Sequence, residues 1–436
     1  MKTFSFQLSR LTSAITVLAL VVTLLAIPAS TPTFASVGAQ SYIVQGANVD
    51  QVSRLVEQYG GTVTSRLDIV HGVGALLSPT VISRLLAEPG ITAITPNTQV
   101  KLVGDGGDDD TEAGVGPNSP ATDYPDVVGA DVVWAQGVNG KGVTVAIVDT
   151  GLGKHKGLFR DVKGKTANRI VAWVDFVDGS RKPRDPNGHG THVAGIIANS
   201  QKGADGEWNG VAPGVKLVGV RVLNEEGYGT YEQVIKGIQW VVKNKDKYKI
   251  KVMNLSMTGP VAAPYWADPL SQAVTTAWAK GITVVVASGN GGPGAMSIGV
   301  PGYNPYVITA GAFTDNYTPD DWSDDYITPF SAAGPTTDGF VKPDLVAPGA
   351  HMVSTMMPQS YLALNHQASQ ISNSYFSMAG SSQAAATVSG VAALILSGNS
   401  DLTPDQVKFR LMATAFPWID LSTCPADAAQ PAAPEL

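Results

Sequence analysis

The chain has 436 residues, of which 44% are hydrophobic and 15% are charged, against about 25% charged residues in an ordinary globular protein. This composition excludes a mainly disordered chain, and the length allows one large domain with smaller companions. The net charge of −7 argues against nucleic acid or an anionic membrane surface as a partner. The single cysteine, Cys424, excludes an intramolecular disulfide and a multi-cysteine zinc cage.

Residues 1–35 have the layout of a secretory signal peptide. Two basic residues precede an apolar stretch from Ala14 to Ile27, and small residues follow up to Ala35, where cleavage is expected. The alternative is a retained membrane anchor, although this stretch is shorter than the ~20 residues that span a bilayer. No later segment is long and apolar enough to span. We therefore expect a secreted protein without membrane contact once the signal is removed.

Residues 36–103 are predicted to form a small α+β domain of the ferredoxin-like type, with the order strand, helix, strand, strand, helix, strand. One helix is expected from Val49 to Tyr59, with Asn48 as its N-cap, and a second helix begins after Ser78. The segment has no catalytic constellation, and such units are common structural modules. Strands are expected over Tyr42–Val44, Thr62–Val70, Gly74–Leu77 and Ile91–Thr95.

Residues 104–123 are predicted to form an acidic, glycine-rich linker. Their low hydrophobicity, like charges and turn formers predict an exposed segment, which makes it a probable processing region. The alternative is calcium binding by the run of carboxylates, but such runs are usually only solvated.

Residues 124–415 are predicted to form the main domain, because apolar strands alternate with helical patterns. This pattern is typical of a doubly wound, mostly parallel sheet with helices on both faces. Residues 416–436 have the composition of a disordered tail. Strands are expected over Val143–Val148, Ile170–Val177, Lys216–Val222, Lys251–Leu255, Thr283–Ala287 and Tyr306–Ala310, and helices over Tyr231–Lys243, over Pro269–Lys280 and from Thr403 through Ala415.

Three short motifs lie where such a sheet places its chemistry, at junctions between strands and the next elements. In GVTVAIVDTG, Asp149 ends a buried strand. Taken alone, this carboxylate is more often a turn former. The triplet Asp-Thr-Gly also occurs in aspartic peptidases, but their mechanism needs two such carboxylates and the chain has no second copy.

The second motif is NGHGTHVAGIIA, where a glycine-rich turn enters an apolar helix. His189 and His192 lie three positions apart and could bind a metal, but no His-Glu-x-x-His arrangement or nearby third ligand accompanies them. A histidine at the start of a helix can instead act as a general base, because neutral imidazole accepts a proton near pH 7.

The third motif is MAGSSQAAATVSGVAALIL, a glycine turn that leads into a helix. Ser382 would present its hydroxyl outward there, and its own backbone N–H would point to the place where an oxyanion forms. The alternative is that Ser381 or Ser382 only caps the helix.

Together, the motifs supply an acid, a base and a nucleophile in the order Asp149, His189, Ser382. This order, with these flanking residues, resembles the subtilisin-like serine peptidases over about residues 129–415. The resemblance implies that Asp149 orients His189, that His189 is the general base, and that Ser382 attacks the scissile carbonyl. His192 matches a position that packs rather than reacts.

The resemblance implies further roles. Asn290, in VVVASGN, would be the side-chain donor of the oxyanion hole, beside the backbone of Ser382. Residues 36–103 would be an inhibitory propeptide that is removed by self-cleavage between about Val103 and Pro120. No cofactor is required for the chemistry, and structural calcium fits the family, with ligands that the sequence does not assign. A monomer that acts on protein substrates is expected. The substrate-binding rims would be Gly227, Tyr228 and Gly229, and Ser256, Met257, Thr258 and Gly259.

Two departures from the family pattern stand out. The nucleophile region reads Gly380-Ser381-Ser382-Gln383-Ala384, where the family commonly has methionine after the serine, and Thr258 replaces a frequent glycine and is expected to narrow the primary specificity pocket. Two other classes remain as alternatives. One is an inactive peptide-binding relative, and the other is an esterase, although esterases usually have the order Ser, Asp, His and a Gly-x-Ser-x-Gly motif.

Overall fold

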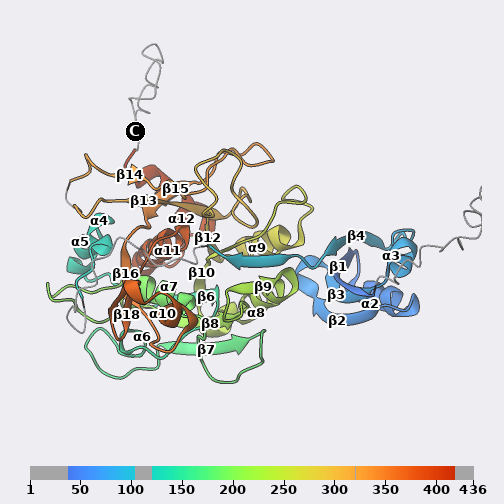
Figure 1. Ribbon diagram of the computed structural model, residues 1–436, viewed down its shortest axis with the longest axis horizontal. Helices are drawn as coiled ribbons and strands as arrows, with labels where there is room; N and C mark the ends of the chain where they lie inside the picture. The colour runs from blue at the N-terminus through green and yellow to red at the C-terminus, as the bar shows by residue number, and fades with distance from the viewer. Residues whose placement is uncertain (1–37, 104–119, 320, 418–436) are drawn as a thin grey trace, which may run out of the picture.

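The computed structural model describes residues 38–103, 120–319 and 321–417 (Figure 1). The predicted signal peptide, most of the predicted linker and nearly all of the predicted tail lie outside these residues. Within the described ranges, no helix is long and apolar enough to cross a membrane.

The small domain is a four-stranded antiparallel sheet covered by two helices. Its strand order is β2-β3-β1-β4, and it has a hydrophobic core of its own. Asn48 and Ser78 cap the two helices as predicted. The elements are β1 (Gln40–Gly46), α2 (Val49–Gln58), β2 (Thr62–Leu67), β3 (Gly72–Leu77), α3 (Pro79–Leu85) and β4 (Ile91–Pro96).

One predicted strand is too long. The expected strand over Thr62–Val70 ends at Leu67, and a 3-10 turn over Asp68–Val70 follows. His71 then adopts a left-handed φ of 53°, which turns the chain back into β3. The turn packs on the large domain, where the backbone N–H of Ile69 donates to Oε1 of Gln239.

The large domain is built on an eight-stranded sheet with the order β14-β13-β12-β10-β6-β8-β7, and β15 also pairs with β13. All of its pairings are parallel except that of β14. The strands are β6 (Thr144–Asp149), β7 (Ile170–Asp175), β8 (Lys216–Arg221), β10 (Ile250–Leu255), β12 (Thr283–Ala287), β13 (Ile308–Thr314), β14 (Tyr326–Ile327) and β15 (Leu345–Pro348).

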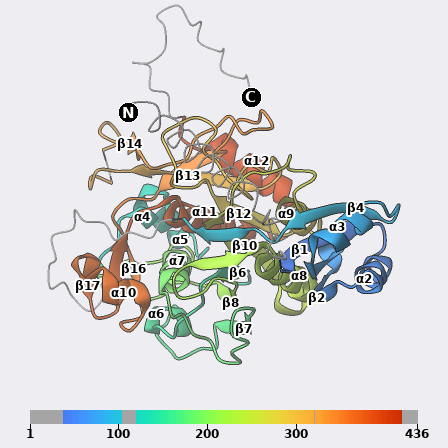
Figure 2. The same cartoon turned by 45° about the vertical axis from the view of Figure 1, so that its right-hand side comes forward.

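Helices cover both faces of this sheet, as expected for a doubly wound fold. Helices α7 (His189–Ala198) and α11 (Ser381–Gly398) pack against each other, and α8 (Tyr231–Tyr248) packs against α9 (Pro269–Ala279) (Figures 1 and 2). Asp268 caps α9, and Thr403 caps α12 (Pro404–Thr414), both as predicted. Helix α8 extends to Tyr248, so the predicted end at Lys243 is too early.

Several elements were not predicted. They include strands β14 and β15, the short helices α4 (Tyr124–Val127), α5 (Ala130–Ala135), α6 (Lys156–Phe159) and α10 (Tyr361–Asn365), and a small antiparallel sheet of β16 (Met352–Thr355), β18 (Tyr375–Met378) and β17 (Gln370–Ser372).

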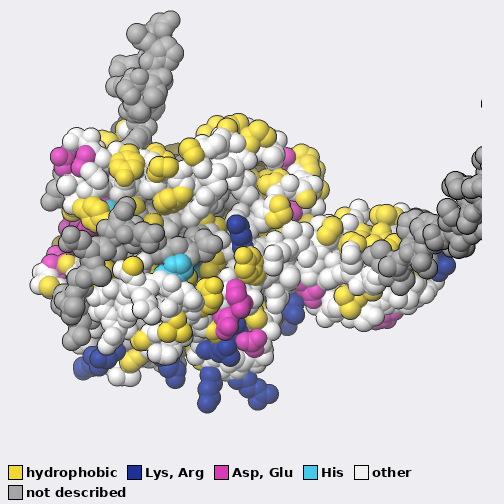
Figure 3. Space-filling model, viewed as in Figure 1, with side chains coloured by type: hydrophobic (Ala, Val, Ile, Leu, Met, Phe, Trp, Pro, Cys, Tyr) yellow, Lys and Arg dark blue, Asp and Glu magenta, His cyan; other side chains and the backbone are white. Residues whose placement is uncertain are grey.

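A further three-stranded sheet joins the two domains. Strand β5 (Gln99–Leu102) leaves the small domain and lies between β9 (Tyr228–Thr230) and β11 (Met257–Thr258), antiparallel to both. Figure 3 shows the small domain as a separate lobe beside the large one. Side-chain hydrogen bonds also cross the junction, since Nε2 of Gln45 donates to Oε1 of Gln272 at 2.7 Å and the hydroxyl of Thr64 donates to the carboxylate of Glu232 at 3.1 Å. The end of the small domain is therefore inserted into the surface of the large one.

Candidate active site

The three motif residues meet at the carboxyl edge of the parallel sheet. Asp149 is the last residue of β6, His189 the first of α7, and Ser382 the second of α11. All three side chains are buried. Gly188, the N-cap of α7, has a left-handed φ of 103°, which few residues other than glycine adopt readily. The sheet and its helix starts thus bring together residues that are far apart in sequence.

Asp149 and His189 form a direct pair. Nδ1 of His189 lies 2.8 Å from Oδ1 of Asp149, which also accepts a hydrogen bond from the backbone of Thr150 at 2.7 Å. Because a carboxylate only accepts, Nδ1 carries the proton and Nε2 presents a lone pair. Nε2 has no hydrogen-bond partner among the described residues, so it is free to take up a proton.

His192 is a packing residue, as expected. It is fully buried, and its Nε2 lies 3.0 Å from the carbonyl oxygens of Met352 and Phe376. Burial lowers the pKa of His192 to about 3, so the ring is neutral. A metal shared by His189 and His192 is not supported, because neither belongs to a group of three or more metal-ligating side chains among the described residues.

Asp185, a carboxylate that was not predicted as part of the site, stabilises the segments that carry the pair. Asp185 accepts four hydrogen bonds: from the hydroxyl of Thr150, from the backbone N–H of Gly188, and from both the backbone and the hydroxyl of Thr191, at 2.6 to 2.9 Å. It therefore ties the end of β6 to the start of α7. The turn-forming run Asp185-Pro186-Asn187-Gly188 was the available signal.

Ser382 faces the end of the small domain. Its hydroxyl donates to the carbonyl oxygen of Val103 at 2.5 Å, and it forms no hydrogen bond with His189. The N-cap of α11 is Gly380, and no side chain caps this helix, so the reading of Ser381 or Ser382 as a simple cap is wrong. The N-terminus of α11 supplies a positive dipole end next to the Val103 carbonyl.

The first residue of α11, Ser381, orients the side chain of Asn290. Its Oδ1 accepts from the backbone N–H and from the hydroxyl of Ser381, both at 3.0 Å. The amide nitrogen is consequently turned away from Ser381. A Cβ atom built on Gly380 would lie 3.1 Å from this Nδ2 and 3.3 Å from the oxygen of Val103, so both atoms border the same small space.

The two predicted rims flank β5. Lys101 pairs with Tyr228 on one side and with Thr258 on the other, and Leu102 pairs with Met257. The backbone N–H of Leu102 donates to Gly227 at 2.9 Å. A Cβ atom on Gly259 would lie 3.3 Å from Val100, so this glycine makes room for the strand. The remaining predicted rim residues also lie here, since Gly229 pairs with Val100 and Ser256 accepts from the N–H of Val103.

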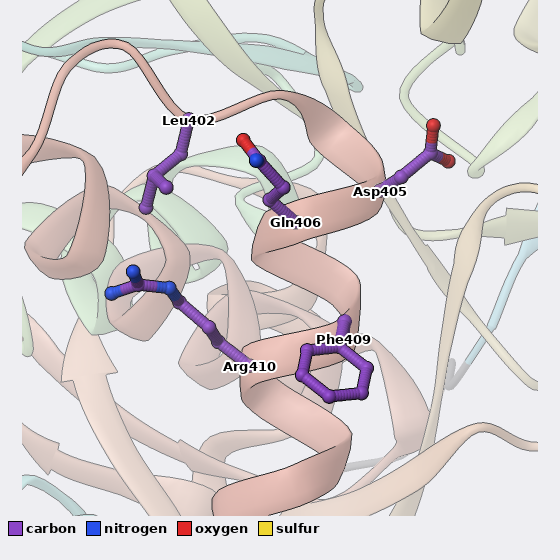
Figure 4. Close-up of a pocket in the computed structure, with 5 residues that line it drawn as sticks. All are labelled: Leu402, Asp405, Gln406, Phe409 and Arg410. Carbon is purple, nitrogen blue, oxygen red and sulfur yellow. The ribbon is translucent and has the colours of Figure 1, made fainter.

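Beside β5 lies a cavity of about 520 Å³ whose lining includes Lys101, Thr258, Met296 and Gly299. Oγ1 of Thr258 is 2.3 Å from where a Cβ of Gly299 would be, so the threonine fills space over that glycine. A second hollow of about 450 Å³ lies on α12 and is lined by Leu402, Asp405, Gln406, Phe409 and Arg410 (Figure 4). It contains none of the predicted reacting groups.

One group of metal-ligand side chains occurs within the described ranges. Ligand atoms of Asp123, Asp315 and His351 all lie within 4.8 Å of one another. Nε2 of His351 is already 2.7 Å from Asp315, and burial raises the pKa of Asp123. Calcium binding stays a prediction without assigned ligands.

The Asp–His pair, the serine at a helix start and the amide beside it define a serine-hydrolase type of site on a doubly wound sheet. The model of the subtilase family, described as Peptidase_S8, matches residues 140–435. The chain therefore belongs to the subtilase family, whose members are serine peptidases and thus hydrolases that need no cofactor for catalysis.

Two relatives agree with this assignment. The serine protease AprX of Bacillus subtilis (strain 168) is 39% identical over 363 residues, which cover 82% of this chain and 76% of that protein. Subtilisin DY of Bacillus licheniformis is 36% identical over 293 residues, which cover 66% of this chain and 89% of that protein. A crystal structure of a cold adapted subtilisin-like serine proteinase has 33% identity and a TM-score of 0.48, and the match covers 63% of this chain and 82% of that one.

Proposed function

We propose that this chain is a secreted, monomeric serine endopeptidase that is made as a self-processing zymogen. It cleaves extended segments of protein substrates through Ser382, His189 and Asp149. The observation that carries the proposal is the contact of the Ser382 hydroxyl with the carbonyl group of Val103, next to a buried Asp149–His189 pair. The family membership supports the same chemistry.

In acylation, Oγ of Ser382 attacks the scissile carbonyl carbon and its proton moves to Nε2 of His189. Asp149 holds the ring through Nδ1 and stabilises its charged form. The carbonyl oxygen becomes an oxyanion, for which Nδ2 of Asn290 and the backbone N–H of Ser382 are the donors. Collapse of this intermediate breaks the C–N bond, and His189 gives its proton to the leaving amine.

In deacylation, water takes the place of the amine. It transfers a proton to His189 as its oxygen attacks the acyl carbon, and a second oxyanion forms. Collapse returns the proton to Oγ of Ser382 and releases the carboxylic acid product. The triad ends in its starting state.

The pairing of β5 supports the mode of substrate binding. Main-chain pairing with β9 and β11 needs no particular side chain, so it suits many extended peptides. Residues 99–103 occupy this groove in the same way. We infer that they inhibit the enzyme until the chain is cut, and that the cut bond follows Val103.

A fluorophosphonate probe tests the nucleophile. We expect it to label the processed protein at Ser382, as located by peptide mapping, and to leave Ser382→Ala unlabelled. The processed enzyme should digest casein. Labelling without casein digestion, but with turnover of simple esters, would favour the esterase alternative, and absence of labelling would favour the inactive relative.

N-terminal sequencing tests the processing. The large fragment of the secreted protein should begin at Gly104, or further along after secondary trimming. Purified Ser382→Ala should remain intact and should be cut when processed native enzyme is added. Loss of the small domain from Ser382→Ala without any added peptidase would contradict self-processing.

A further inference from the structure

Asn290, the proposed side-chain donor of the oxyanion hole, is directly followed by glycine. Three other asparagines share this sequence, namely Asn139, Asn187 and Asn209. In such a pair the backbone nitrogen of the glycine can attack the carboxamide carbon of the asparagine, because glycine has no side chain to hinder the approach. The reaction is intramolecular, so its rate depends on local geometry.

Gly291, which follows Asn290, is exposed and has open space around it. A Cβ atom built on Gly291 would lie 3.9 Å from Ser297, its nearest contact beyond its neighbours in the chain. The backbone N–H of Gly291 donates no hydrogen bond among the described residues. This nitrogen is therefore free to turn towards the side chain of Asn290.

The carboxamide of Asn290 is held in a way that favours such an attack. Its Oδ1 accepts hydrogen bonds from the backbone N–H and from the hydroxyl of Ser381, both at 3.0 Å. Attack on Cγ places negative charge on Oδ1, and these two donors at the N-terminus of α11 stabilise that charge. Nδ2, the nitrogen that must leave, has no hydrogen-bond partner in the part of the chain that the structure describes.

The other three Asn-Gly pairs lack this combination. Their glycines are all buried. Nδ2 of Asn187 and Nδ2 of Asn209 each donate to a backbone carbonyl oxygen at 2.6 Å, so neither nitrogen is free to leave. A Cβ atom on the glycine after Asn139 would lie only 2.6 Å from Val215, so this glycine is tightly packed. The structure thus distinguishes Asn290 from three pairs of the same sequence.

We propose that Asn290 is a site of spontaneous deamidation, with water as the only co-reactant. The backbone nitrogen of Gly291 loses its proton and attacks Cγ of Asn290. The bond from Cγ to Nδ2 then breaks, and Nδ2 takes up a proton and leaves as ammonia. Water opens the resulting cyclic imide to aspartate or isoaspartate.

Deamidation of Asn290 inactivates the proposed active site. In aspartate a carboxylate oxygen takes the place of Nδ2, so the oxyanion of the substrate loses a donor and meets a negative charge. Asn290→Asp, which reproduces one product directly, should therefore lower kcat at least about 100-fold. This consequence rests on the proposed function, whereas the deamidation itself does not.

The Ser382→Ala precursor, which lacks the proposed nucleophile, allows the modification to be measured without self-digestion. The protein is stored at mildly alkaline pH in water enriched in heavy oxygen and is then mapped by mass spectrometry. Heavy oxygen should enter residue 290 at least about 10-fold faster than residues 139, 187 and 209, since one hydrogen bond to a charged atom contributes about that factor.

Gly291→Ala should slow the incorporation at residue 290, because its methyl group hinders the attack. The methyl group has room, so the fold and the initial activity should stay native. Gly294→Ala is the matched control, since it makes the same replacement at an open position of the same loop but follows Pro293, which has no carboxamide. During storage of the active enzymes, Gly291→Ala should retain activity longer than the native enzyme, and Gly294→Ala should not.

Two results would overturn the inference. One is equal incorporation at all four asparagines, and the other is equal incorporation at residue 290 with and without Gly291→Ala. Incorporation confined to residue 290, in a protein whose processed form cleaves no substrate, is a separate result that would support the deamidation and contradict the proposed function.

Discussion

The carbonyl oxygen of Val103 accepts a hydrogen bond of 2.5 Å from the hydroxyl of Ser382, across a separation of 279 positions in the sequence. The side chain of Val103 is only 2% exposed. Val103 directly follows β5, its backbone N–H donates to the carbonyl oxygen of Ser256, and Lys101 of β5 pairs with Thr258. Thr258 therefore lies on the strand that borders the residue preceding the proposed cut.

This relationship predicts the effect of Thr258→Gly on specificity. Removing the Thr258 side chain, which fills the space over Gly299, enlarges the cavity beside β5 that both residues line. We expect kcat/KM after phenylalanine to rise relative to kcat/KM after valine by roughly 10-fold, since each buried methylene contributes about 0.8 kcal/mol. Peptides that differ only at the residue before the cut provide the measurement.

Thr258→Ser is the conservative comparison. It retains the hydroxyl and removes one methyl group, so its preference should lie between those of the native enzyme and Thr258→Gly. A phenylalanine-to-valine ratio that is the same in all three proteins would show that Thr258 does not border this pocket.

Asp185→Asn should impair turnover more than substrate binding. The asparagine side chain has one acceptor atom in place of two and introduces an NH₂ group facing N–H donors, so the link from Thr150 to the start of α7 is broken. We expect kcat to fall at least 10-fold, from the loss of charge-assisted hydrogen bonds, with KM changed little because β9 and β11 are untouched. Steady-state kinetics across pH give both constants.

The pH profile of Asp185→Asn distinguishes a misplaced His189 from a simple loss of folded protein. A misplaced His189 should shift the acidic limb of kcat/KM, which a mere loss of folded protein would not do. Asp246→Asn is a suitable control, because Asp246 is an exposed residue of α8 whose ion pair is with the neighbouring Lys245. An unchanged profile, with kcat reduced only by the unfolded fraction, would contradict the positioning role.

The positions of Asp149, His189 and Ser382 in the fold could be predicted because each motif is local. Asp149, His189 and Ser382 each follow a strand or start a helix, with glycines that allow the turn, and parallel strands bring such positions to one edge. The contact of Val103 with Ser382 has no local signal. Strand β5 has only four residues, and its pairing depends on two partners more than one hundred positions away. Such pairing is not visible in hydrophobic periodicity.

The C-terminal end of α8 could not be predicted from hydrophobic periodicity either. After Lys243 the sequence is Asn-Lys-Asp-Lys-Tyr, which has no apolar stripe, yet the helix continues to Tyr248. Tyr248 stacks on Trp240 at a ring distance of 6.0 Å, and Lys249 ends the helix with a left-handed φ of 55°. Packing and the capping residue, rather than periodicity, decide this boundary.

Lys342 should make stability depend on pH in the alkaline range. Its amine is buried, where it donates to the carbonyl of Val307 and the hydroxyl of Thr309 and pairs with Asp344 at 2.6 Å. Burial lowers the pKa of Lys342 from its ordinary 10.5 to about 7. Between these values the unfolded chain binds more protons than the folded protein, so the free energy of unfolding should rise with pH, with a slope of up to about 1.4 kcal/mol per unit.

Denaturant unfolding of Ser382→Ala at several pH values from 7 to 10 measures this slope without autolysis. Adding Lys342→Met should flatten it, and Asp344 stays paired in that variant because Lys408 lies 3.0 Å away. Lys245→Met, at a lysine of α8 that pairs with the exposed Asp246, should leave the slope unchanged. Equal slopes with and without Lys342 would show that this amine keeps the same charge in the folded and unfolded states across the range, because only a difference in bound protons produces a slope.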